Sequence, residues 1–359
     1  MVIVMKVYKN LKINGKSTDI TVDNGKIIST EPTEKDGIDF GGKQVRPGMI
    51  DIHIHGCAGF DATDNPDKLQ EMSDYLARKG TTTWYPTTLT YDFDKLKEAV
   101  SVKIDDIPGA NIPGFHMEGP YISENKLGVM NAAYLRKPNA DEVKDLRQVK
   151  LINIAPELEG AMEFIEQVDM VVSLGHSVAD YDTAVKAANK GAKCLTHTFN
   201  AMPPMLHRDP SLIGAALTTG MYAQVISDGV HIHPAVVLAL YKMFGSDKMV
   251  LISDCISVTG LTDNGELMFG GKKAYVKDGI CRNEDGALNG GTTDLFKCVK
   301  KAIEFGIPED DAFKMATETP ANLMGLNKGV IDVGYDADFI VIDDDMNITD
   351  VVVSGEIYK

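Results

Sequence analysis

The chain has 359 residues, of which 44% are hydrophobic and 25% are charged, as in an ordinary globular protein with room for one large domain and a small one. Lys and Arg number 36 against 52 Asp and Glu, and the resulting net charge of −16 argues against partners such as nucleic acids and anionic membranes. An anionic substrate would therefore need cations placed locally in its binding site. No apolar run approaches the roughly 20 residues that cross a bilayer.

The cysteines are scattered and include no Cys-x-x-Cys pair, so we expect neither a disulfide framework nor a cysteine zinc site. We expect all of them to be small buried side chains in a reducing compartment, and the protein to be cytoplasmic. They are Cys57, Cys194, Cys255, Cys281 and Cys298.

Both ends of the chain predict short β-strands. The segment Asp23–Gly25 reads Asp-Asn-Gly between two such strands, which is a strong hairpin signal. We expect residues 1–47 and 330–359 to form one small β-sandwich domain around a large insert, 48–329. The predicted strands include Ile20–Val22, Lys26–Ile28, Phe339–Ile342 and Val351–Val353.

The insert alternates apolar, β-rich segments with helical patterns. Eight strands alternating with helices over about 280 residues fit a (β/α)8 TIM-type barrel. The expected strands are Met49–Ile54, Thr82–Leu89, Ile112–Met117, Leu151–Ala155, Met170–Leu174, Cys194–Phe199, Tyr222–Ile226 and Met249–Ile252. Helical patterns include Pro66–Lys79, Phe93–Ile104, Asp180–Lys190 and Pro234–Phe244.

A polar side chain lies at or just beyond the end of each predicted strand. A barrel gathers the carboxyl ends of its strands on one face, where enzymes of this fold have their active sites. A purely structural barrel does not need such a ring of imidazoles and carboxylates, so the pattern predicts a site. The positions are His53 and His55, Thr87, Glu118, Glu157, His176, His197, Asp228 and Asp254.

Five of these residues suit a catalytic metal centre. His53 and His55 are two residues apart on one strand, so both imidazoles point to the same face. Glu118 is costly to bury without a cation. Together with His176 and His197 it forms a Glu-His-His set that leaves positions open for water and substrate.

Asp254, at the end of the eighth strand, suits the role of general base toward a metal-activated water. The cofactor that we expect is a divalent metal, one or two ions per chain. Zinc is the expected ion, with iron, manganese and cobalt as alternatives.

Eight segments, in order along nearly the whole chain, resemble the N-acetylglucosamine-6-phosphate deacetylase family of the amidohydrolase superfamily. They include Gly114-Phe-His-Met-Glu-Gly-Pro120, Leu174-Gly-His-Ser177 and Thr196-His-Thr-Phe-Asn-Ala-Met202. The others are Pro47–Gly56, Ser227–His231, Ser253–Asp254, Leu288–Thr293 and Ala316–Ala321.

The resemblance implies deacetylation of an N-acetyl amino sugar 6-phosphate in a homodimeric enzyme. Glu118, His176 and His197 match the ligands of the principal metal, while His53 and His55 match those of a second metal that only some members keep. Asp254 matches the catalytic aspartate. The residues that match substrate contacts are Asn200, Ala201, Arg208, His231 and, through their backbone, Leu288, Asn289 and Gly290, with Arg208 and His231 near the phosphate.

One departure bears on the substrate. Met130 stands in Gly128-Val-Met-Asn131 where the family usually has a substrate-contacting His, and a thioether cannot donate a hydrogen bond. A related substrate, such as N-acetylgalactosamine 6-phosphate, therefore stays open.

Two other functions are alternatives. A cyclic amidase or deaminase of the superfamily often has a carboxylated Lys after the fourth strand, but this strand runs into Glu157 without one. A non-enzymatic binding or assembly module on the same fold is the other alternative, although such relatives usually lose ligands and none is lost here.

Overall fold

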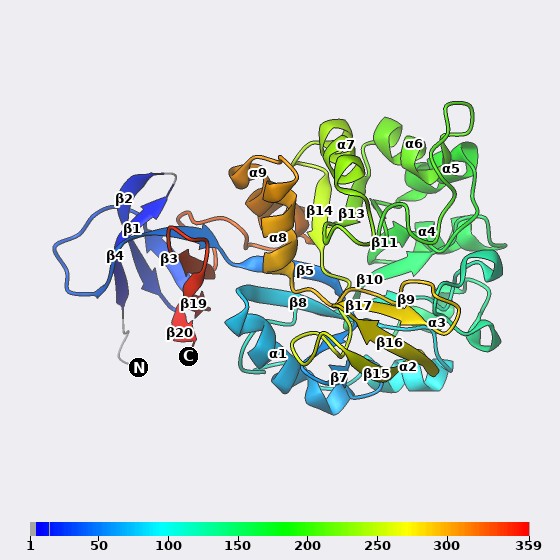
Figure 1. Cartoon of the computed structure of the whole chain (residues 1–359), viewed down its shortest axis with the longest axis horizontal. Coiled ribbons are helices and arrows are strands. Elements are labelled where there is room, and N and C mark those ends of the chain that lie inside the picture. Colours follow the sequence, from blue (N-terminus) through cyan, green and yellow to red (C-terminus); the bar gives the residue numbers. More distant parts are fainter. Residues whose placement is uncertain (1–4, 14, 359) are drawn as a thin grey trace.

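The structure is a computed structural model that describes residues 5–13 and 15–358. A barrel of parallel strands ringed by helices forms the larger part, and a mostly antiparallel sheet built from both ends of the chain lies beside it (Figure 1). The predicted fold class is therefore confirmed.

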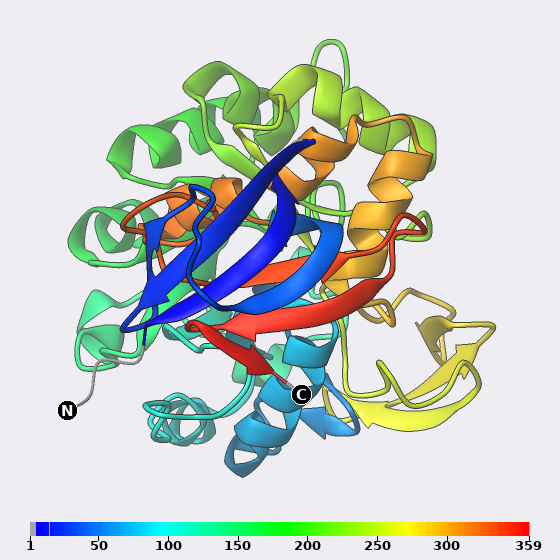
Figure 2. The ribbon, with the colours of Figure 1, turned by 90° about the vertical axis from the view of Figure 1, so that its left-hand side faces the viewer.

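The terminal sheet is continuous, and in the described residues its strand order is β20-β19-β18-β4-β1-β2-β3. β4 joins the two ends, because it pairs in parallel with β1 and antiparallel with β18. The blue N-terminal and red C-terminal strands accordingly run side by side in Figure 2. The strands are β1 (Lys6–Ile13), β2 (Lys16–Asp23), β3 (Lys26–Ser29), β4 (Ile38–Pro47), β18 (Phe339–Ile342), β19 (Ile348–Val353) and β20 (Glu356–Tyr358).

The predicted hairpin is confirmed between β2 and β3, where Asn24 and Gly25 have φ of 48° and 73°. Positive φ at both central residues is what a type I′ turn requires. The sheet has its own apolar core, in which Tyr8 and Phe339 pack edge to face with ring centroids 5.3 Å apart. The domain boundaries near residues 47 and 330 stay a prediction.

The barrel strands follow one another in chain order, from β5 to β14. The backbone N–H of Asp254 donates to the carbonyl of His53 at 2.9 Å and brings the first and last strands together. The strands are β5 (Met49–Ile54), β8 (Thr81–Thr88), β9 (Phe115–Glu118), β10 (Val149–Ile154), β11 (Val171–Leu174), β12 (Cys194–Leu195), β13 (Tyr222–Ile226) and β14 (Met249–Ile252).

Helices cover the outside of the barrel (Figure 1). They are α1 (Leu69–Arg78), α2 (Phe93–Ala99), α3 (Ala140–Val143), α4 (Ala161–Gln167), α5 (Tyr181–Lys190), α6 (Ser211–Thr219), α7 (Pro234–Phe244), α8 (Leu295–Glu304), α9 (Glu309–Lys314) and α10 (Glu318–Met324). Short 3-10 turns lie at Pro66–Lys68, Glu124–Lys126 and Ala132–Tyr134.

Two predicted elements end earlier than expected. β12 ends at Leu195 rather than at Phe199, because His197 and Phe199 have φ of 26° and 76° and turn the chain out of the strand. The helix α2 ends at Ala99, before the predicted Ile104. The sequence also did not predict two small antiparallel sheets, β6 (Gly56–Cys57) with β7 (Phe60–Asp61), and β15 (Gly265–Phe269) with β16 (Lys272–Lys277) and β17 (Ile280–Asn283).

The sheet β15–β17 is the insertion that matters for the site. Its apolar face packs on segments that follow the barrel strands, and Phe269, Ile122 and Met130 belong to one buried cluster. The sheet therefore covers one side of the barrel mouth.

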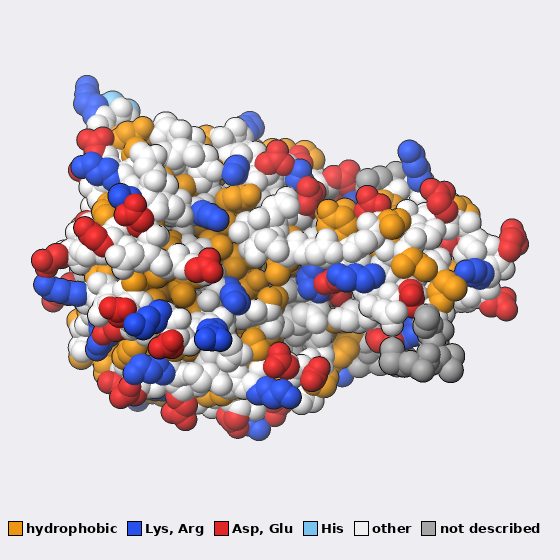
Figure 3. Space-filling model, turned by 180° about the vertical axis from the view of Figure 1, so that it is seen from behind, with side chains coloured by type: hydrophobic (Ala, Val, Ile, Leu, Met, Phe, Trp, Pro, Cys, Tyr) orange, Lys and Arg blue, Asp and Glu red, His pale blue; other side chains and the backbone are white. Residues whose placement is uncertain are grey.

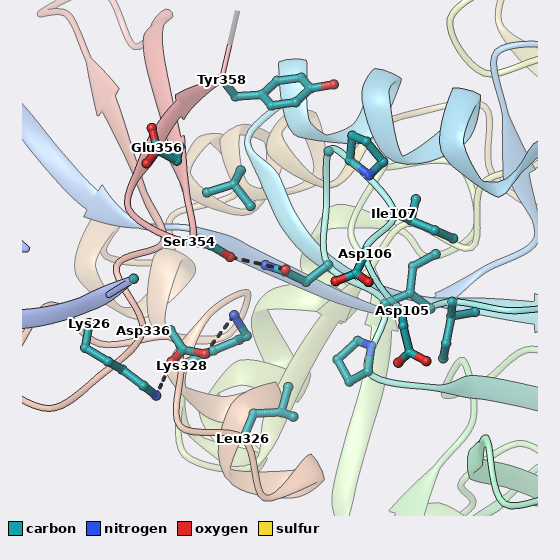
Figure 4. Close-up of a pocket in the computed structure, with 18 of the residues that line it drawn as sticks. Lys26, Asp105, Asp106, Ile107, Leu326, Lys328, Asp336, Ser354, Glu356 and Tyr358 are labelled. Atoms are coloured by element: carbon teal, nitrogen blue, oxygen red, sulfur yellow. Dashed lines mark hydrogen bonds and ion pairs between the residues drawn. The ribbon is translucent and has the colours of Figure 1, made fainter. Parts of the chain in front are cut away.

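A crevice of about 850 Å³ lies between the terminal sheet and the loop before β9 (Figure 4). Lys328 lines the crevice and pairs with Asp336, at 2.9 Å, and with the buried Asp338. Asp338 also accepts the backbone N–H of Ser354 at 2.6 Å. The buried carboxylate of Asp338 thus ties Lys328 to the C-terminal strands of the terminal sheet.

Each of the five cysteines, all within the described residues, is buried and outside any disulfide, as predicted. None of the described helices has the length and apolar character needed to cross a membrane. Basic and acidic side chains are interspersed on the face shown in Figure 3.

Candidate active site

A cavity of about 250 Å³ lies at the carboxyl ends of the barrel strands. It is smaller than the crevice at the terminal sheet, but it gathers the predicted site residues, whereas that crevice has no metal-ligating cluster among the described residues. The cavity is lined by His55, Glu118, Gly128, Val129, Met130, His176, His197, Asn200, Ala201, His231, Asp254, Phe269, Leu288 and Gly290.

Glu118, His176 and His197 converge on one point. Oε1 of Glu118 lies 2.8 Å from Nε2 of His197 and 3.1 Å from Nε2 of His176, and the two imidazole nitrogens are 3.0 Å apart. All three residues are buried. They come from the ends of β9, β11 and β12, so the barrel brings them together from distant parts of the sequence.

The first strand supplies a second group that shares Glu118. Nε2 of His55 is 3.2 Å from Oε2 of Glu118, and Nε2 of His53 is 3.4 Å from Oε1. Oδ1 of Asp254 lies 3.3 Å from Nε2 of His55 and 3.4 Å from Nε2 of His53. Glu118 therefore stands between the two groups of ligand atoms. Its Oε2 faces His55, whereas its Oε1 faces His176 and His197 and also lies near His53.

The hydrogen bonds of the histidine side chains fit a divalent metal bound between them. In three histidines Nδ1 contacts an oxygen acceptor, which leaves the Nε2 lone pair directed at the centre, the usual arrangement of metal-binding histidines. Nε2 of His53 is buried and has no hydrogen-bond partner among the described residues. The contacts are His53 Nδ1 to Gln224 Oε1 at 3.0 Å, His55 Nδ1 to Thr87 O at 3.2 Å and His176 Nδ1 to Lys126 O at 2.7 Å.

The carboxylates are ionised at neutral pH. Burial by itself raises the pKa of Glu118, but its electrostatic and hydrogen-bond interactions with the surrounding histidines outweigh burial and hold that pKa well below its usual range. Burial likewise opposes ionisation of Asp254, and His53 and His55 lower its pKa. Asp254 is therefore unprotonated, as a general base must be.

Backbone strain marks the same residues. His176, His197 and Asp254 have φ of 48°, 26° and 49°, a region that residues other than glycine rarely adopt. Such strain persists only where the surroundings determine the conformation, and it is concentrated at functional sites. At Asp254, the backbone N–H and carbonyl are held by His53 and by Gly291.

The structure brings most of the predicted substrate contacts to this cavity, but not all of them. Asn200, Ala201, His231, Leu288 and Gly290 are among the lining residues given above. The side chain of Asn289 is buried outside the lining, and its role was predicted through its backbone. Arg208 is exposed and also outside the lining, with Nη1 2.6 Å from Nε2 of His207. The substrate roles of these residues stay predictions.

Two residues at strand ends point elsewhere. Glu157 accepts from Ser177 Oγ at 2.6 Å and from the backbone N–H of Val178 at 2.7 Å, so it supports the loop after β11. Thr87 contacts Nδ1 of the buried His116 at 3.2 Å, inside the barrel.

Sequence reasoning missed part of the cavity wall. Phe269 comes from the unpredicted sheet, and its ring lies 5.7 Å from that of His55. Val129 lies beside Met130 in the lining. Met130 is buried, and its sulfur accepts the backbone N–H of Thr90 at 3.3 Å, so it also anchors its own loop. The Gly128-Val-Met-Asn131 segment was the available signal for this wall.

Comparisons with known proteins agree with this geometry. Residues 45–358 match the amidohydrolase family. A curated N-acetylglucosamine-6-phosphate deacetylase from Vibrio furnissii is 34% identical, over 94% of this chain and 90% of the relative. An N-acetylgalactosamine-6-phosphate deacetylase from Escherichia coli is 29% identical, over 94% of each. The crystal structure of N-acetylglucosamine-6-phosphate deacetylase from Pasteurella multocida superposes with a TM-score of 0.91, at 29% identity and 99% coverage of both chains. The chain therefore belongs to the amidohydrolase family, in the branch of the N-acetylglucosamine-6-phosphate deacetylases.

Proposed function

We propose that this protein hydrolyses N-acetylglucosamine 6-phosphate to glucosamine 6-phosphate and acetate. The observation that carries the proposal is the convergence of Glu118, His176 and His197 beside Asp254 in one cavity at the barrel mouth. The curated relatives of this branch have the same activity in their names.

Glu118, His176 and His197 would hold the principal metal, and His53, His55 and Glu118 a second one. A bound divalent metal supplies Lewis acidity, which activates water and polarises a carbonyl group. Asp254 takes the proton from the attacking water and passes it to the amide nitrogen. The C–N bond then breaks, releasing acetate and the free amine.

The rest of the cavity would orient the sugar. Asn200 and His231 offer polar side chains, and Leu288 and Gly290 offer backbone groups at the wall. Arg208 would act on the phosphate, as the family resemblance implies.

Further features belong to this proposal. Zinc is the proposed ion, because a set of imidazoles with a carboxylate suits it. We also propose a homodimer in the cytoplasm, and unpaired cysteines agree with a reducing compartment. We propose two domains. Residues 1–47 and 330–359 form the small β-sandwich domain, and residues 48–329 form the barrel domain.

A second candidate substrate is N-acetylgalactosamine 6-phosphate. The Escherichia coli relative with that activity aligns with 94% of this chain. Met130 lies in the cavity wall, where the family usually has a substrate-contacting His. The test is acetate release from both phosphorylated sugars and their unphosphorylated forms, compared as kcat/KM. Preference for the galacto sugar would assign the second substrate, and no acetate release from any of them would refute a deacetylase.

A further inference from the structure

Asp228, just beyond β13, uses its two carboxylate oxygens for different purposes. Oδ1 accepts the backbone N–H groups of Val230, at 2.8 Å, and His231, at 2.9 Å. Oδ2 lies 2.7 Å from Nδ1 of His231. The side chains of Asp228 and His231 are only 7% and 6% exposed. One carboxylate therefore shapes the loop and also holds the imidazole ring.

This contact determines which atom of the ring is available. With Nδ1–H donating to Asp228, Nε2 is left for the cavity, which His231 lines. No protein partner for Nε2 occurs in the described part of the chain. The charged groups that face the ring are Asp228, Asp254 and Arg282. Burial and Arg282 favour the neutral ring, but the two carboxylates outweigh them and raise the pKa of His231.

A cationic side chain at this position matters because the rest of the described lining offers none outside the proposed metal centre. The described lining of the cavity contains the carboxylates of Glu118 and Asp254 and no Lys or Arg. The chain as a whole carries a net charge of −16. An anionic substrate thus depends on short-range contacts, and His231 is the imidazole of the lining that lies outside the two groups of metal-ligating residues.

We propose that Asp228 is a positioning residue that holds His231 as a cationic hydrogen-bond donor toward the phosphate of the substrate. This inference rests on the proposed function, which places a phosphorylated amino sugar in the cavity. It adds a residue that touches no substrate itself and acts through the ring.

Asp228→Asn separates this role from a structural one. The amide oxygen can still accept the N–H groups of Val230 and His231, so the loop is retained. The amide N–H would face Nδ1, which favours a neutral ring with its proton on Nε2. We expect KM for N-acetylglucosamine 6-phosphate to rise on the order of tenfold at pH 7, because Nε2 still donates to the phosphate but the ring has lost the positive charge that strengthens this hydrogen bond. The values of kcat, and of KM for unphosphorylated N-acetylglucosamine, are expected to change little.

The pH profile gives a second readout. In wild type, KM for the phosphorylated sugar is expected to rise as the pH passes the raised pKa of His231, because the ring loses its charge. In Asp228→Asn this step should be absent. In a His231→Gln background, Asp228→Asn should have no further effect on KM. Asp92→Asn, which removes a charge from the exposed cap of α2, is the matched control.

Equal increases of KM for both sugars, or additive effects of the two substitutions, would show that Asp228 is only structural and overturn the inference. Should Asp228→Asn not fold, an NMR titration of wild type decides, with His231 assigned by comparison with His231→Gln. A ring pKa at or below the ordinary value would overturn the proposal. Failure of the proposed function looks different, because wild type would then show no preference for the phosphorylated sugar or release no acetate.

Discussion

Replacing Asp254 by Asn tests the chemical step most directly. The substitution keeps the size and shape of the side chain but removes its ability to take a proton from water. Asp254 is 7% exposed, and its backbone bonds to His53 and Gly291 do not depend on the carboxylate. We therefore expect the variant to fold and to bind substrate with a nearly unchanged KM.

The structure also indicates that no other carboxylate of the described lining can take over. The other carboxylate in the described lining, Glu118, has both oxygens within 3.4 Å of histidine nitrogens. Loss of a general base costs a factor of about 10² to 10⁴ in rate. We expect a decrease in kcat of at least about 10², which corresponds to roughly 2.7 kcal/mol of transition-state stabilisation.

The assay is acetate release at saturating substrate, with the metal content of each preparation measured in parallel. Asp92→Asn serves as the control for loss of one carboxylate. Near-normal turnover by metal-loaded Asp254→Asn would refute the assignment of the base. A variant that no longer binds metal would instead show that Asp254 is a ligand.

Three more predictions follow from other parts of the molecule. Wild type loaded with excess Zn²⁺ is expected to bind two ions per chain by elemental analysis, and a His53→Ala/His55→Ala variant one; one ion in both would contradict the second group of ligands. Arg208→Ala is expected to raise KM for the phosphorylated sugar by a factor that corresponds to about 1.5–3 kcal/mol, and unchanged KM values would remove Arg208 from the site. Lys328→Met leaves the carboxylate of Asp338 buried without its cation, so the free energy of unfolding is expected to fall by roughly 3 kcal/mol in denaturant titrations at pH 7. Burial already raises the pKa of Asp338, and loss of Lys328 raises it further. A carboxyl group with a raised pKa in the folded state destabilises that state as the pH rises, so Lys328→Met should lower the free energy of unfolding less at pH 5 than at pH 7. An effect of the substitution that is independent of pH would contradict this account.

Much of the fold and of the candidate site could be predicted from the sequence, because both depend on local periodicity. Alternation of apolar and polar residues at period two identifies His53 and His55 as neighbours on one face of a strand. Parallel strands that alternate with helices close into a barrel, and closure places the residues after the strands at one mouth. The convergence of Glu118, His176 and His197 follows from these rules without any knowledge of side-chain contacts.

What only the tertiary structure decided depends on packing between distant segments. The sheet β15–β17 finds its place through the buried cluster of Phe269, Ile122 and Met130, and no local pattern encodes such a contact. The turn after β12 requires positive φ at His197, a strained conformation that surrounding contacts impose. The same is true of Asp228, which reads in the sequence as one more polar residue after a strand. The hydrogen bonds from His231 to the Asp228 carboxylate form only because the loop after β13 folds back over that carboxylate. Sequence spacing alone does not predict them, because hydrogen-bond geometry depends on the path of the backbone.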